Sequence, residues 1–145
     1  MKSKDIIKYT KELKAYHNTD DPYKIADYYG ISIIHRDNCI KGFTAHTIKT
    51  QGYPTTISIN NAYTEFSKKI LCAHELGHAL LHEDGCNHFA ITEKNVFTNI
   101  EQEANLFAIA LLDDGSVKKH VAIPLEKMNN YMLKSIIDYN LKFNT

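Results

Sequence analysis

The nine residues His-Glu-Leu-Gly-His-Ala-Leu-Leu-His at positions 74–82 constrain the fold of this chain more than any other stretch. Apolar residues around and within the stretch recur at helical spacing, which predicts a buried helix over residues 62–82. His74 and His78 are four residues apart, so a helix places both rings on one face, about 6 Å apart along its axis. Two imidazole nitrogens that bind one zinc ion at about 2.0–2.1 Å need this spacing. The fold must therefore bury this helix and leave one face of it available to a metal.

Glu75, which follows the first histidine, completes the pattern that zinc proteases use: two ligands and a base. From this position its carboxylate reaches a water molecule at the metal without itself becoming a ligand. The competing interpretation is structural, with histidines that satisfy buried polar groups and bind no metal. Gly77 lowers helix propensity by about 1 kcal/mol relative to alanine. Its presence indicates close approach by a substrate or a neighbouring strand.

The third histidine of the stretch, His82, has poor geometry for the same metal. It lies so far beyond His74 that its Cα is about 12 Å further along a straight helix. Residues 79–81 contain no glycine turn that would bend the chain back. Cys72 is also excluded, because it points about 200° away from His74. We therefore expect His82 and Cys72 to lie outside the ligand set.

The third protein ligand is expected from a second helix, over residues 101–112, where Glu101 and Glu103 are the candidates. With Phe107 as the centre of the buried stripe, Glu103 lies about 40° from that centre and Glu101 about 120° from it. Glu101 also has another role available, in a capping box with Thr98. The sequence therefore predicts Glu103 as the third ligand. Two histidines, one glutamate and an open position would form a catalytic zinc site.

The rest of the chain predicts an α+β fold in a single domain, residues 1–145. Helices are expected within residues 1–30, with the second capped by Asp21 and Pro22 and closed by Gly30. Three strands within residues 31–60 indicate a small, mainly antiparallel sheet, with the strands following one another as a meander. The zinc helices occupy residues 62–112 and are separated by a loop over residues 85–97. Asn60 and Asn61 are expected to cap the first zinc helix, Gly85 to end it, and further helices to follow over residues 116–145.

The composition excludes several classes of function. The formal net charge is zero and Arg36 is the only arginine, so direct binding to nucleic acid is not expected. No stretch has the 18 or so consecutive apolar residues of a membrane span, and the N-terminus is not a signal peptide. Three irregularly spaced cysteines fit reduced thiols better than disulfides. A cytoplasmic protein without a membrane partner is expected.

Three segments in succession resemble the ImmA/IrrE metallo-endopeptidases. A strand ends in Ile-Asn within Thr56-Ile-Ser-Ile-Asn-Asn61, and the zinc helix follows as Ile70-Leu-Cys-Ala-His-Glu-Leu-Gly-His-Ala-Leu-Leu-His82. A second helix then reads Glu101-Gln-Glu-Ala-Asn-Leu-Phe-Ala-Ile-Ala-Leu-Leu112. The resemblance covers about residues 20–112. One departure is Leu111-Leu-Asp-Asp-Gly115, where members of the family often read Leu-Leu-x-Pro.

The resemblance implies a zincin-like fold in which His74, His78 and Glu103 bind Zn²⁺ and Glu75 is the catalytic base. It also implies a substrate, because known members on phages and mobile elements relieve repression by cutting a helix-turn-helix repressor. The alternative is a zinc-stabilised anti-repressor module that binds the repressor without cleaving it. The two functions differ at Glu75, which a purely structural zinc site does not require.

For the cleavage reaction, the expected mechanism is hydrolysis in which zinc polarises the peptide carbonyl and Glu75 transfers a proton from water to the leaving amine. The edge strand of the sheet is a candidate to hold an extended substrate. A further donor should stabilise the oxyanion. His46, Tyr53 and Tyr131 remain open as candidates for that donor.

Overall fold

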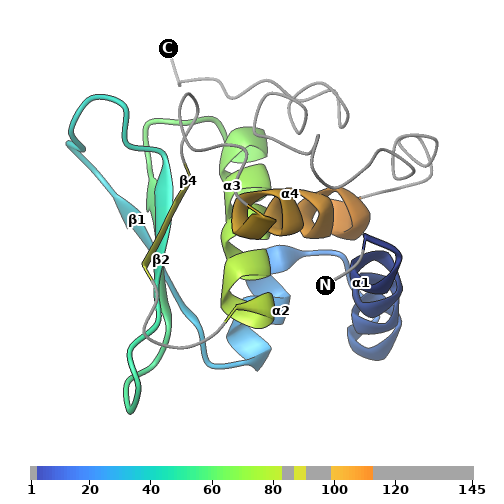
Figure 1. Cartoon of the computed structure of the whole chain (residues 1–145). Coiled ribbons are helices and arrows are strands. Elements are labelled where there is room, and N and C mark those ends of the chain that lie inside the picture. The colour runs from blue at the N-terminus through green and yellow to red at the C-terminus, as the bar shows by residue number, and fades with distance from the viewer. Residues whose placement is uncertain (1–2, 83–86, 91–98, 113–145) are drawn as a thin grey trace.

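The computed structural model describes residues 3–82, 87–90 and 99–112 (Figure 1). The described elements are the helices and strands α1 (Ser3–His17), α2 (Pro22–Tyr28), β1 (Ser32–Arg36), β2 (Ala45–Ile48), β3 (Thr56–Asn60), α3 (Glu65–Leu81), β4 (Asn87–Ala90) and α4 (Asn99–Leu112). The expected α+β class is confirmed. The predicted helices over residues 116–145 and the helix terminator Gly85 lie outside the described residues.

The four strands form one sheet in the order β1-β3-β2-β4. β2 is antiparallel to both β3 and β4, whereas β1 is parallel to β3. The sheet is thus mainly antiparallel, as expected, but it is not the predicted meander. β3 lies between β1 and β2 because it is the most buried strand, with residues 57–60 all buried, whereas β1 is mostly exposed and suits an edge. The fourth strand, β4, lies in the segment predicted as a loop, where the sequence lacks a run of β-branched residues.

One face of the sheet packs against α3. Ala45 is paired with Ile59 and Thr47 with Ile57, so these four side chains share one face, and all four are buried. In Figure 1, α3 lies between this sheet and α4, and α1 lies on the far side of α4. Helix α3 is therefore covered on two sides, as its apolar sequence requires.

The start of α3 differs from the prediction. Thr64 is the N-cap, and its side chain accepts a hydrogen bond from the Ser67 backbone N–H at 3.3 Å. Asn60 and Asn61 act in the preceding turn instead. The Asn60 side chain accepts from the Ala62 N–H at 3.0 Å, which supports the turn that leads from β3 towards α3.

The N-terminal helices follow the sequence closely. Asp21 accepts a hydrogen bond from the Tyr23 N–H at 2.9 Å, and Pro22 begins α2. Gly30 ends the turn after α2 with φ +71°, a conformation that favours glycine. Helix α1 packs on α4 through the rings of Tyr9 and Phe107, whose centroids are 6.5 Å apart. No helix in the described part of the chain is long and apolar enough to span a membrane.

Helices α3 and α4 approach each other closely at Gly77. A Cβ atom added there would lie 3.1 Å from the Cα of Ala104 and 3.1 Å from Cδ1 of Phe107. The close approach that this glycine indicates is made by a helix and not by a strand. Since no side chain fits between the two backbones at this point, the separation of the two helices is set by the glycine.

We expect Gly77→Ala to destabilise the protein by about 1 kcal/mol. Overpacking a core typically costs about 1–3 kcal/mol, while the gain in helix propensity is about 1 kcal/mol. Denaturant unfolding of the two metal-free proteins measures the difference. In a Phe107→Leu background the same substitution should cost less, because one of the close contacts is relieved. A Gly77→Ala protein more stable than wild type would contradict the close packing described here.

Candidate metal centre

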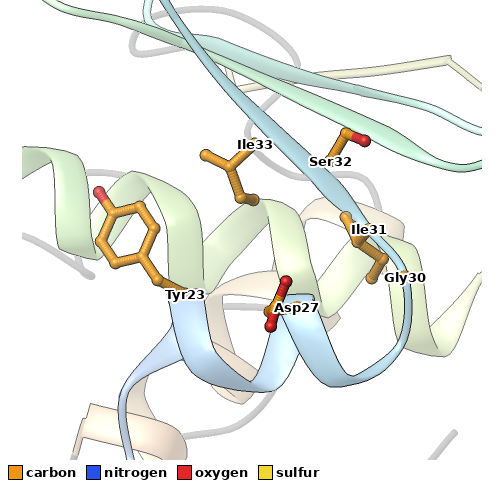
Figure 2. Close-up of a pocket in the computed structure, with 6 residues that line it drawn as sticks. All are labelled: Tyr23, Asp27, Gly30, Ile31, Ser32 and Ile33. Atoms are coloured by element: carbon orange, nitrogen blue, oxygen red, sulfur yellow. The ribbon is translucent and has the colours of Figure 1, made fainter.

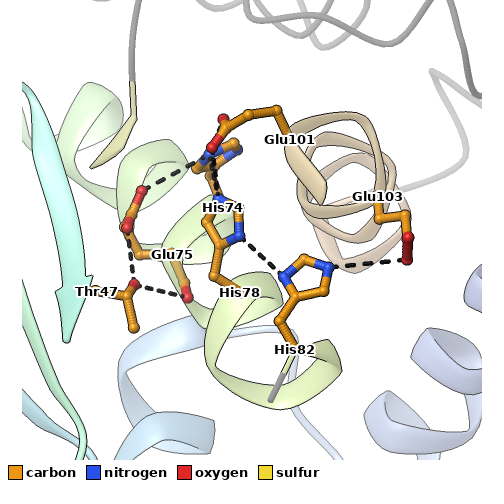
Figure 3. A network of polar contacts seen from close by, with 7 residues as sticks. All are labelled: Thr47, His74, Glu75, His78, His82, Glu101 and Glu103. Carbon is orange, nitrogen blue, oxygen red and sulfur yellow. Dashed lines mark hydrogen bonds and ion pairs between the residues drawn. The ribbon is translucent and has the colours of Figure 1, made fainter. Parts of the chain in front are cut away.

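The two histidines of α3 face each other within the protein interior. His74 and His78 are 1% and 0% exposed, and their Nε2 atoms are 3.2 Å apart (Figure 3). The i, i+4 spacing predicted from the sequence produces this arrangement. Both rings thus direct the same type of nitrogen towards one point on the α4 side of the helix.

Glu101 of α4 completes the cluster. Its Oε1 lies 3.0 Å from His78 Nε2 and its Oε2 lies 3.1 Å from His74 Nε2. Glu103, which the sequence analysis selects as third ligand, is not in this cluster; its Oε2 lies 3.8 Å from His82 Nε2 instead. The structure thus brings Glu101, and not the predicted Glu103, to the histidine pair.

The sequence argument for Glu103 assumed a single buried stripe, which α4 does not have. Every residue from 101 to 111 except Glu103 is buried, so burial does not single out Phe107 as the centre of the face that meets α3. Ala104 and Phe107 both approach Gly77, and Ala104 does so through its backbone. Glu101 lies about 60° from Ala104 and one turn earlier, whereas Glu103 lies about 100° away. A small residue on α4 opposite Gly77 was the signal in the sequence that could have identified the correct face.

Asn105, one turn after Glu101, also belongs to this face of α4. It is fully buried, and its side chain contributes to the raised pKa of His74. Sequence reasoning missed this residue. Its i, i+4 relation to Glu101 places both polar side chains on the same side of α4. Asn105 therefore belongs to the buried polar surroundings of His74.

The carboxylate of Glu75 lies on the other side of α3, towards the sheet. It is fully buried, its Oε1 accepts a hydrogen bond of 2.7 Å from the Thr47 hydroxyl, and its Oε2 lies 3.7 Å from His74 Nε2. Thr47 reaches it from β2 (Figure 3). Among the described residues, Oε2 has no hydrogen-bond partner. One carboxylate oxygen is thus fixed by the sheet, and the other is directed to the histidine pair.

Burial and neighbouring charges shift the pKa values in this cluster. Burial raises the pKa of Glu75 to about 8, against the opposing effects of His74 and the Thr47 hydroxyl. For Glu101, burial acts in the same direction, but hydrogen bonds and charge from His74 and His78 outweigh it and hold the pKa well below its usual range. For His74, burial lowers the pKa, yet Glu101, Glu75 and Asn105 raise it overall. The two glutamates thus have opposite tendencies: Glu101 is ionised and Glu75 readily holds a proton.

The donor set fits a divalent metal ion. One ligand atom from each of His74, His78 and Glu101 lies within 4.8 Å of the others. Ligands about 2.0–2.1 Å from a tetrahedral zinc ion are about 3.3 Å apart, close to the 3.0–3.2 Å observed between the nearest donor atoms. Two imidazoles and one carboxylate suit zinc and related transition metals. The arrangement also leaves a position for water or substrate.

The other candidate residues lie apart from this cluster. On β2, His46 alternates with Thr47 and so points to the opposite face of the sheet from Glu75. Tyr53 is 74% exposed in the turn between β2 and β3, and Tyr131 lies outside the described residues. Cys72 is buried, which raises the pKa of its thiol and makes it unreactive. None of the described oxyanion candidates reaches the cluster.

A surface pocket of about 500 Å³ lies at the opposite edge of the sheet (Figure 2). Its lining comes from α2, the following turn and β1: Tyr23, Asp27, Gly30, Ile31, Ser32 and Ile33. Asp27 is its only carboxylate, and none of its residues belongs to the His74 cluster. The pocket offers no metal-ligand set, so the buried cluster is the candidate site.

Comparison with known proteins agrees with the site. The Peptidase_M78 family, described as the IrrE N-terminal-like domain, matches residues 26–114. An uncharacterised immunity-region protein 2 of Bacillus phage phi105 is 35% identical over 102 residues, which are 66% of this chain and 60% of the relative. The matched region thus spans less than two thirds of that relative's length. No solved structure matches the chain.

The matched region contains His74, His78 and Glu101 as well as Glu75, and it includes both helices that carry them. The resemblance drawn from the sequence motifs is confirmed. With its buried His-His-Glu cluster, the chain belongs to the Peptidase_M78 family of IrrE N-terminal-like domains and contains a metallopeptidase-type domain.

Proposed function

We propose that this chain is a zinc-dependent endopeptidase that cleaves a helix-turn-helix repressor of a phage or mobile element and so relieves repression. The observation that carries the proposal is the buried set of His74, His78 and Glu101 with the Glu75 carboxylate beside it. The proposal takes residues 1–145 as one metalloprotease domain that acts in the cytoplasm.

In this proposal His74, His78 and Glu101 hold the metal. When bound, zinc supplies Lewis-acid polarisation of the scissile carbonyl and lowers the pKa of the attacking water. The three side chains come from two helices whose separation is fixed at Gly77, so the donor atoms are preorganised. Asn105, which is buried on the same side of α4 as Glu101, is the residue proposed to orient His74.

Glu75 is the proposed general base. Its Oε2 accepts a proton from the attacking water and then gives that proton to the leaving amine. A pKa raised by burial to about 8 suits both steps near neutral pH, although a bound cation would lower that value. Thr47 holds Oε1 at 2.7 Å and thereby keeps Oε2 directed to the site.

The substrate is proposed from two observations. The phage relative is described as an immunity-region protein, which supports a role in the control of phage immunity. In the described sheet β4 is an edge strand, and it pairs with β2, which carries Thr47. An extended segment of the repressor would add to this edge through main-chain hydrogen bonds. Recognition of DNA would then be left to the repressor.

A non-catalytic anti-repressor module would need the three proposed ligands but not Glu75. Burying a carboxylate that is not a ligand costs stability, and a cost of this kind is typical of residues with a function. Its position 3.7 Å from His74 Nε2 therefore favours catalysis over simple binding.

We expect Glu75→Gln to lose cleavage of the helix-turn-helix repressor encoded beside this chain by at least about 100-fold, because general-base catalysis contributes about 10²–10⁴-fold. Mass spectrometry of the incubated repressor measures the fragments. Glu12→Gln, on the exposed face of α1, is the matched control and should cleave normally. A zinc-loaded Glu75→Gln protein that cleaves as fast as wild type would rule out this role.

Metal analysis separates the two glutamates of α4. Wild type should bind one zinc ion per chain, and Glu101→Gln should weaken binding by more than the roughly 10–100-fold typical of outer-shell changes. Glu103→Gln should retain zinc with an affinity within about tenfold of wild type. Competition with a chromophoric chelator provides the affinities. The reverse order of effects would restore Glu103 as the ligand.

The pKa of Glu75 predicts a pH-dependent cost to the metal-free protein. Because burial raises this pKa from 4.5 to about 8, ionisation favours the unfolded chain, and stability is lost as pH rises through that interval. In the presence of a chelator, Glu75→Gln should therefore become progressively more stable than wild type as the pH rises above about 5. The difference in stability between the two proteins should reach a constant value above about pH 8. Thermal unfolding across this range measures the difference. A difference independent of pH would contradict the buried, protonatable state.

A further inference from the structure

The end of α3 places a third histidine behind the ligand pair. His82 Nδ1 lies 3.0 Å from His78 Nδ1, the ring nitrogen that does not face His74 and Glu101. On the other side of His82, its Nε2 lies 3.8 Å from Glu103 Oε2. In Figure 3 the side chains lie one after another in space: Glu103 on α4, then His82, then His78 at the candidate centre.

The backbone holds His82 in this place. Its N–H donates to the His78 carbonyl at 3.1 Å, as the last hydrogen bond of α3. Its carbonyl accepts a hydrogen bond from Lys49 Nζ, which also donates to the Ala79 carbonyl at 2.8 Å. The lysine ammonium therefore caps the C-terminal end of α3, where a positive charge is favourable. The side chains of His82 and Glu103 are only 8% and 13% exposed, so their contact is largely shielded from solvent.

Hydrogen-bond chemistry leaves one consistent arrangement for these groups. If His78 gives its Nε2 lone pair to a metal, its proton is on Nδ1, which must then donate. His82 Nδ1 lies opposite and must accept. The neutral His82 ring then carries its own proton on Nε2, and that N–H is on the side of the Glu103 carboxylate.

We propose that His82 and Glu103 are positioning residues for the metal centre: His82 fixes the tautomer and orientation of His78, and the nearby negative charge of Glu103 favours the His82 tautomer with its proton on Nε2. The inference rests on the proposed metal centre, whether or not that centre cleaves peptides. Metal-ligating histidines are commonly held in this way by a second polar group, and loss of that group typically costs about 10–100-fold in metal affinity. It also accounts for two residues that the ligand set does not use.

Two substitutions of His82 separate a hydrogen-bond role from a packing role. Asparagine keeps an acceptor at the δ position, whereas leucine places a methyl group there. We expect His82→Leu to weaken zinc binding about 10–100-fold and His82→Asn to stay within about threefold of wild type. Glu103→Gln should weaken binding by less than tenfold in wild type and have no effect in the His82→Asn background, since asparagine has no group that reaches Glu103.

Competition with a chelator measures zinc affinity, circular dichroism of the metal-free proteins checks folding, and ¹⁵N NMR of the zinc-loaded wild type reports the tautomers. The expected spectrum has the proton on Nδ1 of His78 and on Nε2 of His82.

Unchanged zinc affinity in folded His82→Leu, or an equal loss of affinity in His82→Asn and His82→Leu, would overturn the positioning role. If wild type binds no zinc, both the metal centre and this inference fall. If wild type binds zinc without cleaving the repressor, only the protease proposal is contradicted. The zinc affinities of the His82 variants then still decide whether His82 is a positioning residue.

Discussion

The close packing of α3 on α4 at Gly77 is the contact on which the candidate site depends. Because the glycine has no side chain, the backbone of Ala104 can approach α3 directly. This separation brings Glu101 within 3.0–3.1 Å of both histidine nitrogens. A wider helix pair would separate the carboxylate from the imidazoles. The candidate ligand set thus depends on one helix–helix contact and on the rotation of each helix within it.

The site concentrates buried ionisable groups at a cost to stability. His74, His78 and Glu75 are almost completely buried, and Glu101 is 7% exposed. Unpaired charges in such surroundings are unfavourable, and their mutual contacts offset this cost only in part. Glu75 is the clearest case, because burial makes it hold a proton more tightly than an exposed glutamate does. Buried ionisable groups that reduce stability are expected at a functional site, because the reaction needs them there.

The elements around α3 have distinct parts in this arrangement. The sheet contributes Thr47, whose hydroxyl fixes Glu75 from one side of the helix. Helix α4 contributes Glu101, Glu103 and Asn105 on the other side, and Lys49 caps the end of α3 behind His82. The match to the Peptidase_M78 family covers all of these residues. The sheet, α4 and Lys49 therefore fix the position of α3 and the orientation of its polar side chains.

The sequence by itself determined what depends on local geometry. The i, i+4 spacing of His74 and His78 defines a shared helical face, and the caps and apolar periodicity identify the described helices and three of the strands. Only the tertiary structure decided the position of β3 between β1 and β2, the contact of Thr47 with Glu75, and the placement of Glu101, and not Glu103, beside the two histidines. The physical reason is that a helix buried on almost every side carries no stripe to mark its facing side. Its rotation is set by the packing at Gly77, between residues far apart in the sequence.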